Sequence, residues 1–327
     1  MLAALVRLAG GMLIAATLQI SQAAPAHTLV VIPKLVGISY YDAVKQGIDR
    51  AAAELPDLQV IWAGPTLDRV EKQIELVEHY IPSHPDVIAV AANDPVAIVP
   101  VLQQAQAAGI HVMSWDGDTD LREFFVNLVD YQDFGTAMVD ALVEQMGHSG
   151  EVAIITTTFY APNQSNWIAA IKSHLYAHDP GLKIVDIRPA GESSEESYRV
   201  TRDLLNTNPQ LKGLIALGAP NLPGAARALE EAGLAGKVAL VGNSTPNQMR
   251  PYLKRGVVHK VLLWNAPDHG YLTVYSAYNL LQGKLHAGQP FAAGHLGLLT
   301  PRGDDTSMQV NLPVLVFTRD NVDQYDF

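Results

Sequence analysis

Four apolar runs of strand length follow one another at regular intervals in the first third of the chain. They read TLVVIP (Thr28 to Pro33), LQVIWAG (Leu58 to Gly64), VIAVAA (Val87 to Ala92) and IHVMSW (Ile110 to Trp115). Amphipathic stretches such as residues 71–81 separate them. Strands that are apolar at nearly every position are buried on both faces, so the alternation predicts a parallel sheet covered by helices.

The same alternation begins again near residue 150. The new runs are EVAIITTT (Glu151 to Thr158), LKIVDI (Leu182 to Ile187), LKGLIAL (Leu211 to Leu217) and KVALVG (Lys237 to Gly242). Two sets of strand and helix units predict an α/β protein with two lobes, each built on a parallel sheet. A chain of 327 residues with 48% hydrophobic content is long enough to give both lobes a core.

The first residues differ in composition from the rest. One early positive charge, Arg7, precedes an apolar stretch that extends to Ile20, and small residues follow at Ala23 and Ala24. This order is typical of a secretory signal peptide, so we expect residues 1–23 to be a leader that is removed after export. A retained membrane anchor is the weaker alternative because polar residues interrupt the stretch before it could span a bilayer. An exported chain without cysteine fits the periplasm of a bacterium.

Charge and missing motifs argue against several function classes. The chain has 33 acidic and 22 basic residues and a formal net charge of -11, which repels nucleic acid and anionic lipid. We therefore expect no nucleic-acid partner. The sequence has no dinucleotide-binding glycine pattern, no phosphate-binding loop and no nucleophile elbow. Its histidines are scattered singly, so we expect no metal site and no cofactor.

Polar or small residues follow several of the predicted strands. Lys34 comes after the first run, Asp116 after the fourth, residues 159–164 after the fifth, Ala219 after the seventh, and Asn265 after HKVLLW. In an open parallel sheet, ligands bind outside the carboxyl ends of the strands. These positions are therefore candidates for one binding site.

The stretch HVMSWDGDT places two carboxylates, Asp116 and Asp118, directly after a predicted strand. A calcium loop is improbable, since Leu121 stands where the turn glycine is needed and Asn127 where the bidentate acid is needed. A hydrolytic pair is unfavourable because the two acids would lie side by side rather than opposed. We expect Asp116 to bind ligand hydroxyls, and Asp118 to cap the turn or to balance Lys34.

Five motifs occur in order after the leader. They are VVIPKLVG (30–37), SWDGDT (114–119), NSTPNQMRPYLKRG (243–256), LLWN (262–265) and YDF (325–327). Together they resemble the periplasmic sugar-binding proteins of ABC importers, in the branch that holds the autoinducer-2 and rhamnose receptors. The resemblance implies the type I periplasmic binding protein fold, in which two doubly wound parallel-sheet lobes are joined by a hinge of three crossings and close on one small ligand.

The resemblance also suggests the lobe boundaries. We place the crossings near residues 127–130, 242–244 and 265–267. The N-terminal lobe would comprise residues 26–127 and 245–265, and the C-terminal lobe residues 128–244 and 266–327. The insertion at residues 286–307 is expected to be a covering loop.

Ligand contacts follow from the resemblance position by position. Lys34, Asp116 and Gln164 match the receptors of autoinducer-2, whereas Asn163 stands where those receptors have an acid. In the loop LGA at residues 217–219 only the alanine is kept, and an amide replaces an acid after Trp264. Loss of a carboxylate removes a strong acceptor, so a neutral monosaccharide or polyol fits at least as well as an autoinducer-2-like furanose. The expected ligand-binding residues are Lys34, Tyr40, Tyr41, Asp116, Asn163, Gln164, Ala219 and Asn265.

The chemistry of these residues supports a sugar site independently. Carboxylate, amide and ammonium groups supply the mixed acceptors and donors that vicinal hydroxyls require. Tyr40 and Tyr41, expected in the turn after the first strand, could be flat walls for the carbon-bearing face of a sugar. For Trp115 and Trp264 we favour core packing. For Lys34 the structural alternative is an ion pair with Asp116 or Asp118.

Two classes of function remain. The leading hypothesis is a monomeric, non-enzymatic receptor that delivers a small sugar, such as a pentose, a deoxyhexose or a polyol, to an ABC permease in the inner membrane. Within the same class, the chain could be a sensor subunit that presents its ligand to a chemoreceptor or a histidine kinase. A remote alternative is an exported glycoside hydrolase. The effector domain of a transcription factor shares the fold, but the leader stands where the DNA-binding headpiece would be.

Overall fold

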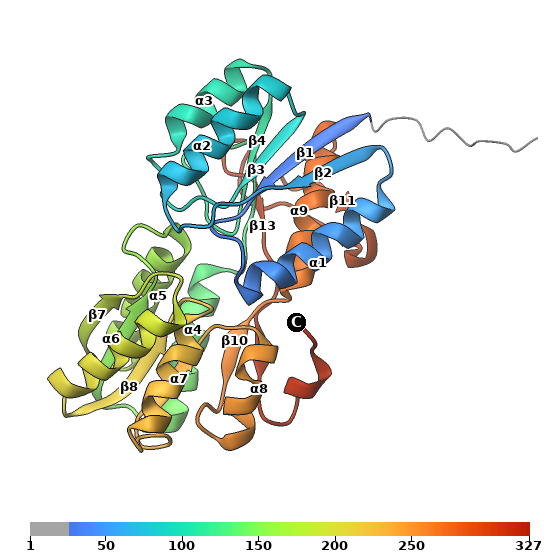
Figure 1. Ribbon diagram of the computed structural model, residues 1–327. Helices are drawn as coiled ribbons and strands as arrows, with labels where there is room; N and C mark the ends of the chain where they lie inside the picture. The colour runs from blue at the N-terminus through green and yellow to red at the C-terminus, as the bar shows by residue number, and fades with distance from the viewer. Residues whose placement is uncertain (1–25) are drawn as a thin grey trace, which may run out of the picture.

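The computed structural model describes residues 26–327 and shows two α/β lobes, one above the other in Figure 1. The expected leader, residues 1–23, lies outside the described residues. Both lobes contain a parallel sheet with helices on its two faces, which confirms the predicted fold class. Among residues 26–327, no helix is both long and apolar enough to cross a membrane.

The sheet of the first lobe has six strands in the order β13-β5-β4-β3-β1-β2, all paired in parallel. Their bounds are β1 His27–Ile32, β2 Leu58–Trp62, β3 Val87–Val90, β4 His111–Trp115, β5 Phe124–Val126 and β13 Gln309–Val310. Helices α2 (Val70–Tyr80) and α3 (Val99–Ala107) cover one face, and α1 (Ser39–Glu54) and α9 (Ala266–Leu281) cover the other. Successive residues of β1 therefore pack into different cores, Leu29 and Val31 on one face and Val30 and Ile32 on the other.

Helices α1 and α9 approach closely because each carries a glycine at the contact. A Cβ at Gly47 would lie 1.7 Å from the carbonyl oxygen of Pro267, and one at Gly270 would lie 2.0 Å from that of Val44. Any larger side chain would force the helices apart. This packing fixes α9 on the first lobe, although it lies more than 200 residues from α1 in the chain.

The sheet of the second lobe has four parallel strands in the order β7-β6-β8-β9. Their bounds are β6 Gly150–Thr156, β7 Leu182–Pro189, β8 Leu211–Ala216 and β9 Ala239–Gly242. Helices α4 (Tyr131–Met146) and α5 (Pro162–His178) cover one face, and α6 (Ser194–Thr207) and α7 (Asn221–Glu231) cover the other. This lobe also contains α8 (Pro246–Arg255) and the antiparallel pair of β10 (Val261–Leu263) and β14 (Leu315–Phe317).

The later lobe boundaries differ from the prediction. Residues 245–265 were expected in the first lobe, but a parallel bridge from Asn243 to Leu262 places β10 beside β9 in the second lobe. Residues 266–327 were expected in the second lobe, but α9 packs on α1 and β13 pairs with β5 in the first. The predicted assignment is therefore wrong for residues 245–265 and for the segment from α9 to β13, whereas β14 and the C-terminal residues lie in the second lobe as predicted. The chain passes between the lobes after β5, between β10 and α9, and between β13 and β14, with no crossing at residues 242–244.

The insertion at residues 286–307 lies on the first lobe. It contains the short hairpin of β11 (Phe291–Ala292) and β12 (Leu298–Leu299), with the 3-10 turn η2 (Gly294–Leu296) between the strands. Asn279 of α9 donates to the carbonyl of Ala292, and Tyr271 of α9 packs edge to face against His295. The insertion covers α9 and leads into the edge strand β13. Two further 3-10 turns are η1 (Ile81–Ser83) and η3 (Val322–Gln324).

Candidate functional site

A cavity of about 310 Å³ lies between the two lobes, beside the carboxyl ends of strands from both sheets. The strand ends place polar side chains here because their backbone leaves the sheet and turns toward the opposite lobe. The residues that line the cavity are Lys34, Tyr40, Tyr41, Asp116, Asn163, Gln164, Trp167, Glu192, Leu217, Ala219, Asn243 and Trp264. Seven of the eight residues predicted from the sequence are in this set.

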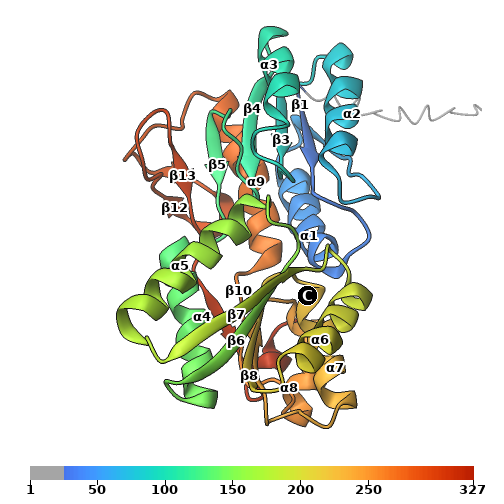
Figure 2. The ribbon, with the colours of Figure 1, turned by 90° about the vertical axis from the view of Figure 1, so that its left-hand side faces the viewer.

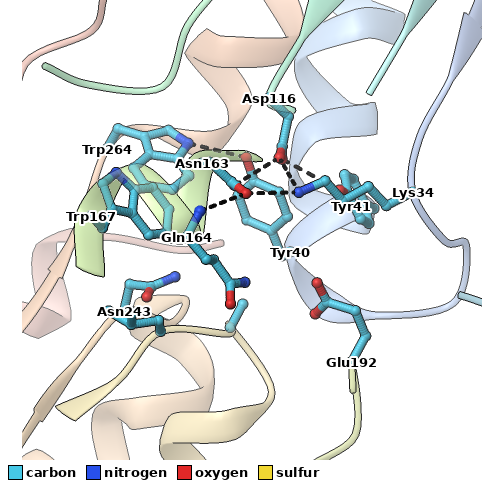
Figure 3. Close-up of a pocket in the computed structure, with 12 residues that line it drawn as sticks. Lys34, Tyr40, Tyr41, Asp116, Asn163, Gln164, Trp167, Glu192, Asn243 and Trp264 are labelled. Atoms are coloured by element: carbon cyan, nitrogen blue, oxygen red, sulfur yellow. Dashed lines mark hydrogen bonds and ion pairs between the residues drawn. The ribbon is translucent and has the colours of Figure 1, made fainter. Parts of the chain in front are cut away.

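Lys34 follows β1 and is only 3% exposed. Its ammonium nitrogen lies 3.2 Å from Asp116 Oδ1 and donates to Asn163 Oδ1 at 3.0 Å (Figure 3). The first contact is a buried ion pair within the first lobe, and the second joins that lobe to the start of α5 in the second. Lys34 therefore both balances the acid and holds the lobes together. Its ion pair with Asp116 is the structural alternative raised from the sequence, whereas its contact with the second lobe was not predicted.

Asp116 is held in an unusual backbone conformation at the end of β4. Its φ angle is 60°, in the left-handed region that aspartate tolerates better than most residues. The carboxylate accepts from Tyr41 Oη at 3.3 Å and from Asn163 Nδ2 at 3.2 Å, besides its pair with Lys34. The next residue is Gly117, where a Cβ would lie 2.5 Å from the carbonyl oxygen of Ala92 and 2.9 Å from Lys34 Cε. The turn is therefore shaped to let Lys34 reach Asp116.

Asp118 has a separate role. Its carboxylate accepts from Ser114 Oγ, from the backbone N–H of Thr119 and from the guanidinium of Arg122. It caps the turn, as expected, but its charge is balanced by Arg122 rather than by Lys34.

Tyr40 is fixed by a chain of hydrogen bonds. Burial lowers the pKa of His269, so the ring is neutral, and its Nε2 donates to the carbonyl of Val126 at 3.1 Å. His269 Nδ1 is then left as an acceptor for Tyr40 Oη at 3.5 Å, and Tyr40 Oη accepts from Trp264 Nε1 at 3.1 Å. Tyr40 thus has a set orientation beside the cavity.

The two tyrosines lie on the first turn of α1 rather than in the turn before it. Tyr40 and Tyr41 pack edge to face, with centroids 4.9 Å apart. Burial raises the pKa of both phenols well above the usual value, and the negative charge of Asp116 adds to this effect, so both remain neutral donors. Trp115 and Trp264 are both buried, as expected, and Trp264 also reaches the cavity wall.

The first turn of α5 supplies two amides from the second lobe. Gln164 Oε1 accepts from Thr156 Oγ1 at 2.5 Å and from the backbone N–H of Thr157 at 2.7 Å. These bonds use the oxygen and turn the amide nitrogen toward the cavity. Trp167, one turn further along α5, packs against Trp264 at 6.0 Å between centroids and also lines the cavity.

Ala219 lines the cavity as expected, whereas Asn265 does not belong to the lining set. The side chain of Asn265 accepts from the backbone N–H of Asp268 and caps α9. The expected ligand contact is thus replaced by a helix cap. In the LGA loop, a Cβ at Gly218 would lie 2.2 Å from Asn221 Oδ1, so this backbone has no room for an aspartate side chain.

Sequence reasoning missed three polar or aromatic residues of the second lobe, which are Trp167, Glu192 and Asn243. Glu192 follows β7 and Asn243 follows β9, so the rule that located Lys34 and Asp116 could have found them. Burial, together with the negative charge of Asp68, raises the pKa of Glu192 to about 8 against the opposing effect of Lys34. Among residues 26–327, no group of acidic and histidine side chains is arranged to hold a metal ion.

Comparisons with known proteins agree with this architecture. A family model described as "Periplasmic binding protein domain" matches residues 29–285. A D-ribose/D-allose-binding protein of Pseudomonas aeruginosa is 30% identical over 219 residues, which cover 65% of this chain and 68% of the relative.

Two solved structures are also similar. A solute-binding protein of an ABC transporter from Clostridium phytofermentas, with bound L-rhamnose, has a TM-score of 0.87 and 26% identity, and covers 93% of this chain and 99% of its own. LsrB from Clostridium saccharobutylicum, in complex with AI-2, has a TM-score of 0.86 and 23% identity, and covers 92% of this chain and 100% of its own. The second likeness shows the fold. Together these matches confirm the resemblance seen in the motifs.

Proposed function

Because the chain belongs to the periplasmic binding protein family, we propose that it is a receptor that captures a small neutral sugar between its lobes. The proposed ligand is a pentose, a deoxyhexose, a polyol or an autoinducer-2-like furanose. The relatives support this class, since the named ones are binding proteins for D-ribose, D-allose and L-rhamnose. The proposed destination of the ligand is an ABC permease in the inner membrane, reached by a monomeric receptor in the periplasm.

The observation that carries the proposal is the polar network across the cavity. Lys34, Asp116 and Asn163 form mutual contacts of 3.0 to 3.2 Å that join the two lobes, and all are under 5% exposed. Carboxylate, amide and ammonium groups in a dry cavity hold vicinal hydroxyls strongly, because each hydroxyl both donates and accepts. Tyr40 and Trp264 add aromatic surface for the carbon-bearing side of a sugar ring.

The composition of the network favours a neutral ligand. Asn163 provides an amide where the receptors of autoinducer-2 have an acid, and the single ammonium group of the cavity is already paired with Asp116. An anionic ligand would therefore meet carboxylates without a free cation.

Delivery would depend on closure of the lobes. The three crossing segments allow one lobe to turn against the other, and a ligand that contacts both lobes binds the closed form more tightly. The closed form would then dock on the permease. A sensor subunit that presents the closed form to a chemoreceptor or a histidine kinase would use the same site.

An enzymatic role has one observation in its favour. Asp116 and Glu192 reach the cavity from opposite lobes, and burial raises the pKa of Glu192 to about 8, as in the acid of a glycosidase. However, Asp116 is occupied by Lys34, Tyr41 and Asn163 and is poorly placed to act as a nucleophile. We therefore propose binding without turnover.

Calorimetry on the exported protein tests the proposal. The titrants are D-ribose, D-allose, L-rhamnose, D-arabinose, a polyol and autoinducer-2. We expect saturable binding of one of them with a low-micromolar or tighter dissociation constant, no product on prolonged incubation, and no binding by Asp116→Ala. Unchanged affinity in that variant would refute the site, turnover would support the hydrolase, and no binding across the panel would refute the proposed ligand class.

A further inference from the structure

Glu192 is the acidic residue that the second lobe contributes to the cavity. It lies in the loop between β7 and α6, just before Ser193, which caps α6. Figure 3 shows its carboxyl group pointing across the cavity toward Lys34 and Tyr41 on the first lobe. It is therefore placed to contact whatever lies between the lobes.

The carboxyl group of Glu192 has no donor from the protein. Within residues 26–327, no hydrogen bond or ion pair reaches it, in contrast to Asp116, which has three partners. A second acceptor in the same wall is also unpartnered, since Asn243 is 4% exposed and its Oδ1 has no hydrogen bond. Asn243 Oδ1 is thus a buried acceptor that lacks a donor, and the half-buried carboxyl group of Glu192 also finds no donor on the protein, so both are free to accept from a ligand.

The charged and titratable groups around Glu192 belong to the first lobe. Asp68 faces it from the loop between β2 and α2, Lys34 from the end of β1, Asp116 from the end of β4, and Tyr40 and Tyr41 from α1. Lys34 is engaged by Asp116 and Asn163 and makes no ion pair with Glu192. Closure therefore brings Glu192 against two other acids without giving it a cation.

We propose that Glu192 is a specificity-determining residue: its carboxyl group makes closure of the cleft depend on a neutral ligand that donates a hydroxyl to it. This inference rests on the proposed function and names the group by which the second lobe recognises the ligand. A ligand without a donor at this point leaves the acid buried and unpaired, so it cannot hold the lobes closed.

Proton linkage gives the proposal a measurable consequence. In the closed form, burial raises the pKa of Glu192 from the ordinary 4.5 to about 8. In an open form, the first-lobe acids move away and the group returns to water, so its pKa falls back toward the ordinary value. Below pH 4.5 both forms are protonated and closure takes up no proton. Between 4.5 and about 8 closure takes up a proton, so ligand-free closure becomes less favourable as pH rises, and above about 8 the cost is constant.

Small-angle scattering on the ligand-free protein between pH 5 and pH 9 tests this directly. We expect the radius of gyration of the wild-type protein to increase with pH as the closed fraction falls, and that of Glu192→Gln to stay small and independent of pH. In Asp68→Asn the response should be smaller and should end at a lower pH, because loss of this neighbouring negative charge lowers the pKa of Glu192 in the closed form. Glu195→Gln is the matched control, since Glu195 is exposed on α6 and pairs with Arg227. It should behave like the wild type.

A second measurement tests for the hydrogen bond between Glu192 and a hydroxyl of the ligand. Calorimetry with D-allose and its monodeoxy derivatives should show one position whose removal weakens wild-type binding by about tenfold or more but has little effect in Glu192→Ala, which lacks the acceptor. A wild-type response to pH that persists in Glu192→Gln, or no response in either, would overturn the inference. If D-allose and the other sugars fail to bind while the scattering follows the prediction, the proposed ligand class fails and the role of Glu192 in closure stands.

Discussion

The two walls of the cavity differ in how far their polar groups are satisfied. On the first lobe, Lys34, Asp116, Tyr40 and Tyr41 bond to one another or to fixed neighbours. On the second lobe, Glu192 has no protein donor, and Asn243 Oδ1 and the indole nitrogen of Trp167 are buried without partners. The first wall is a preorganised surface that needs no ligand to be stable. On the second wall, Asn163 and Gln164 are also bonded to the protein, but the side chains of Glu192 and Asn243 gain hydrogen bonds only when a ligand fills the cavity.

This contrast suggests that the first wall contributes to both stability and ligand recognition, whereas the unpartnered groups of the second wall contribute to recognition alone. Substitutions in the first wall should disturb both the folded lobe and ligand binding, because the same bonds serve both. Substitutions of Glu192 or Asn243 in the second wall should weaken binding with little effect on stability, because no side-chain hydrogen bond to the protein is lost. The four predictions below test that division, from the largest effect to the smallest.

Breaking the buried ion pair of the first wall should have the largest effect. Lys34→Met leaves Asp116 buried without its cation, so we expect a loss of about 3 to 5 kcal/mol in the free energy of unfolding, together with loss of sugar binding. Chemical denaturation of the ligand-free protein measures the first effect. Lys45→Met, which removes an exposed pair with Asp49, should change stability by under about 0.5 kcal/mol. Equal losses in the two variants would contradict the account.

Crowding the turn beside Lys34 should have an intermediate effect. In Gly117→Ala the new Cβ would meet Lys34 Cε at 2.9 Å and the carbonyl oxygen of Ala92 at 2.5 Å. We expect a destabilisation of about 1 to 3 kcal/mol and a loss of affinity of about tenfold or more, since the lysine is pushed from its place. Thermal unfolding and calorimetry check the two parts. Wild-type affinity in a correctly folded Gly117→Ala protein would show that the position of Lys34 is unimportant.

The second wall should show the opposite pattern. Asn243→Ala removes an acceptor that has no protein partner, so the free energy of unfolding should change by under about 1 kcal/mol. Affinity for the bound sugar should fall by about tenfold. Paired denaturation and calorimetry decide the question, and a large loss of stability with unchanged affinity would reverse the assigned roles of the walls.

Substitution of Asp118 should have the smallest effect, and that effect should fall on stability alone. Asp118→Asn weakens the pair with Arg122 and the cap on Thr119, so we expect a destabilisation of about 1 kcal/mol. Because Asp118 points away from the cavity lining, affinity should be unchanged. Calorimetry on Asp118→Asn beside Asp116→Ala separates the two acids of the DGD turn. A shared loss of binding would mean that the turn acts as a unit.

Much of this architecture could be predicted from local sequence pattern. Eight strands of the two sheets overlap the predicted apolar runs, because parallel strands buried on two faces leave a signal that needs no knowledge of tertiary contacts. The short strands β5 and β13 of the first sheet were not predicted. The positions of Lys34, Asp116 and Gln164 followed from strand ends and motif order. The lobe to which each later segment belongs could not be predicted in this way. Both α8 and α9 have helical patterns that fit either lobe. For α9 the choice depends on its close contact with α1 at Gly47 and Gly270, which lie far apart in the sequence.

The errors at individual site residues, one missed and one wrongly predicted, have a similar explanation. Glu192 follows a strand whose exposed face is mixed, so its carboxyl resembles that of any solvated loop until the first lobe is placed against it. Asn265 follows a strand as Lys34 does, but the next helix takes its side chain as a cap. Position after a strand therefore predicts which residues can reach the cavity. It does not predict which competing local bond a side chain forms.

The most direct test of the central claim is a crystal structure of the protein with the sugar that binds most tightly in the calorimetric panel. We predict one sugar between the lobes, with hydroxyl oxygens about 2.5 to 3.0 Å from a carboxylate oxygen of Asp116 on one wall and of Glu192 on the other. A sugar bound outside this cavity, or one whose hydroxyls reach neither acid, would contradict the account.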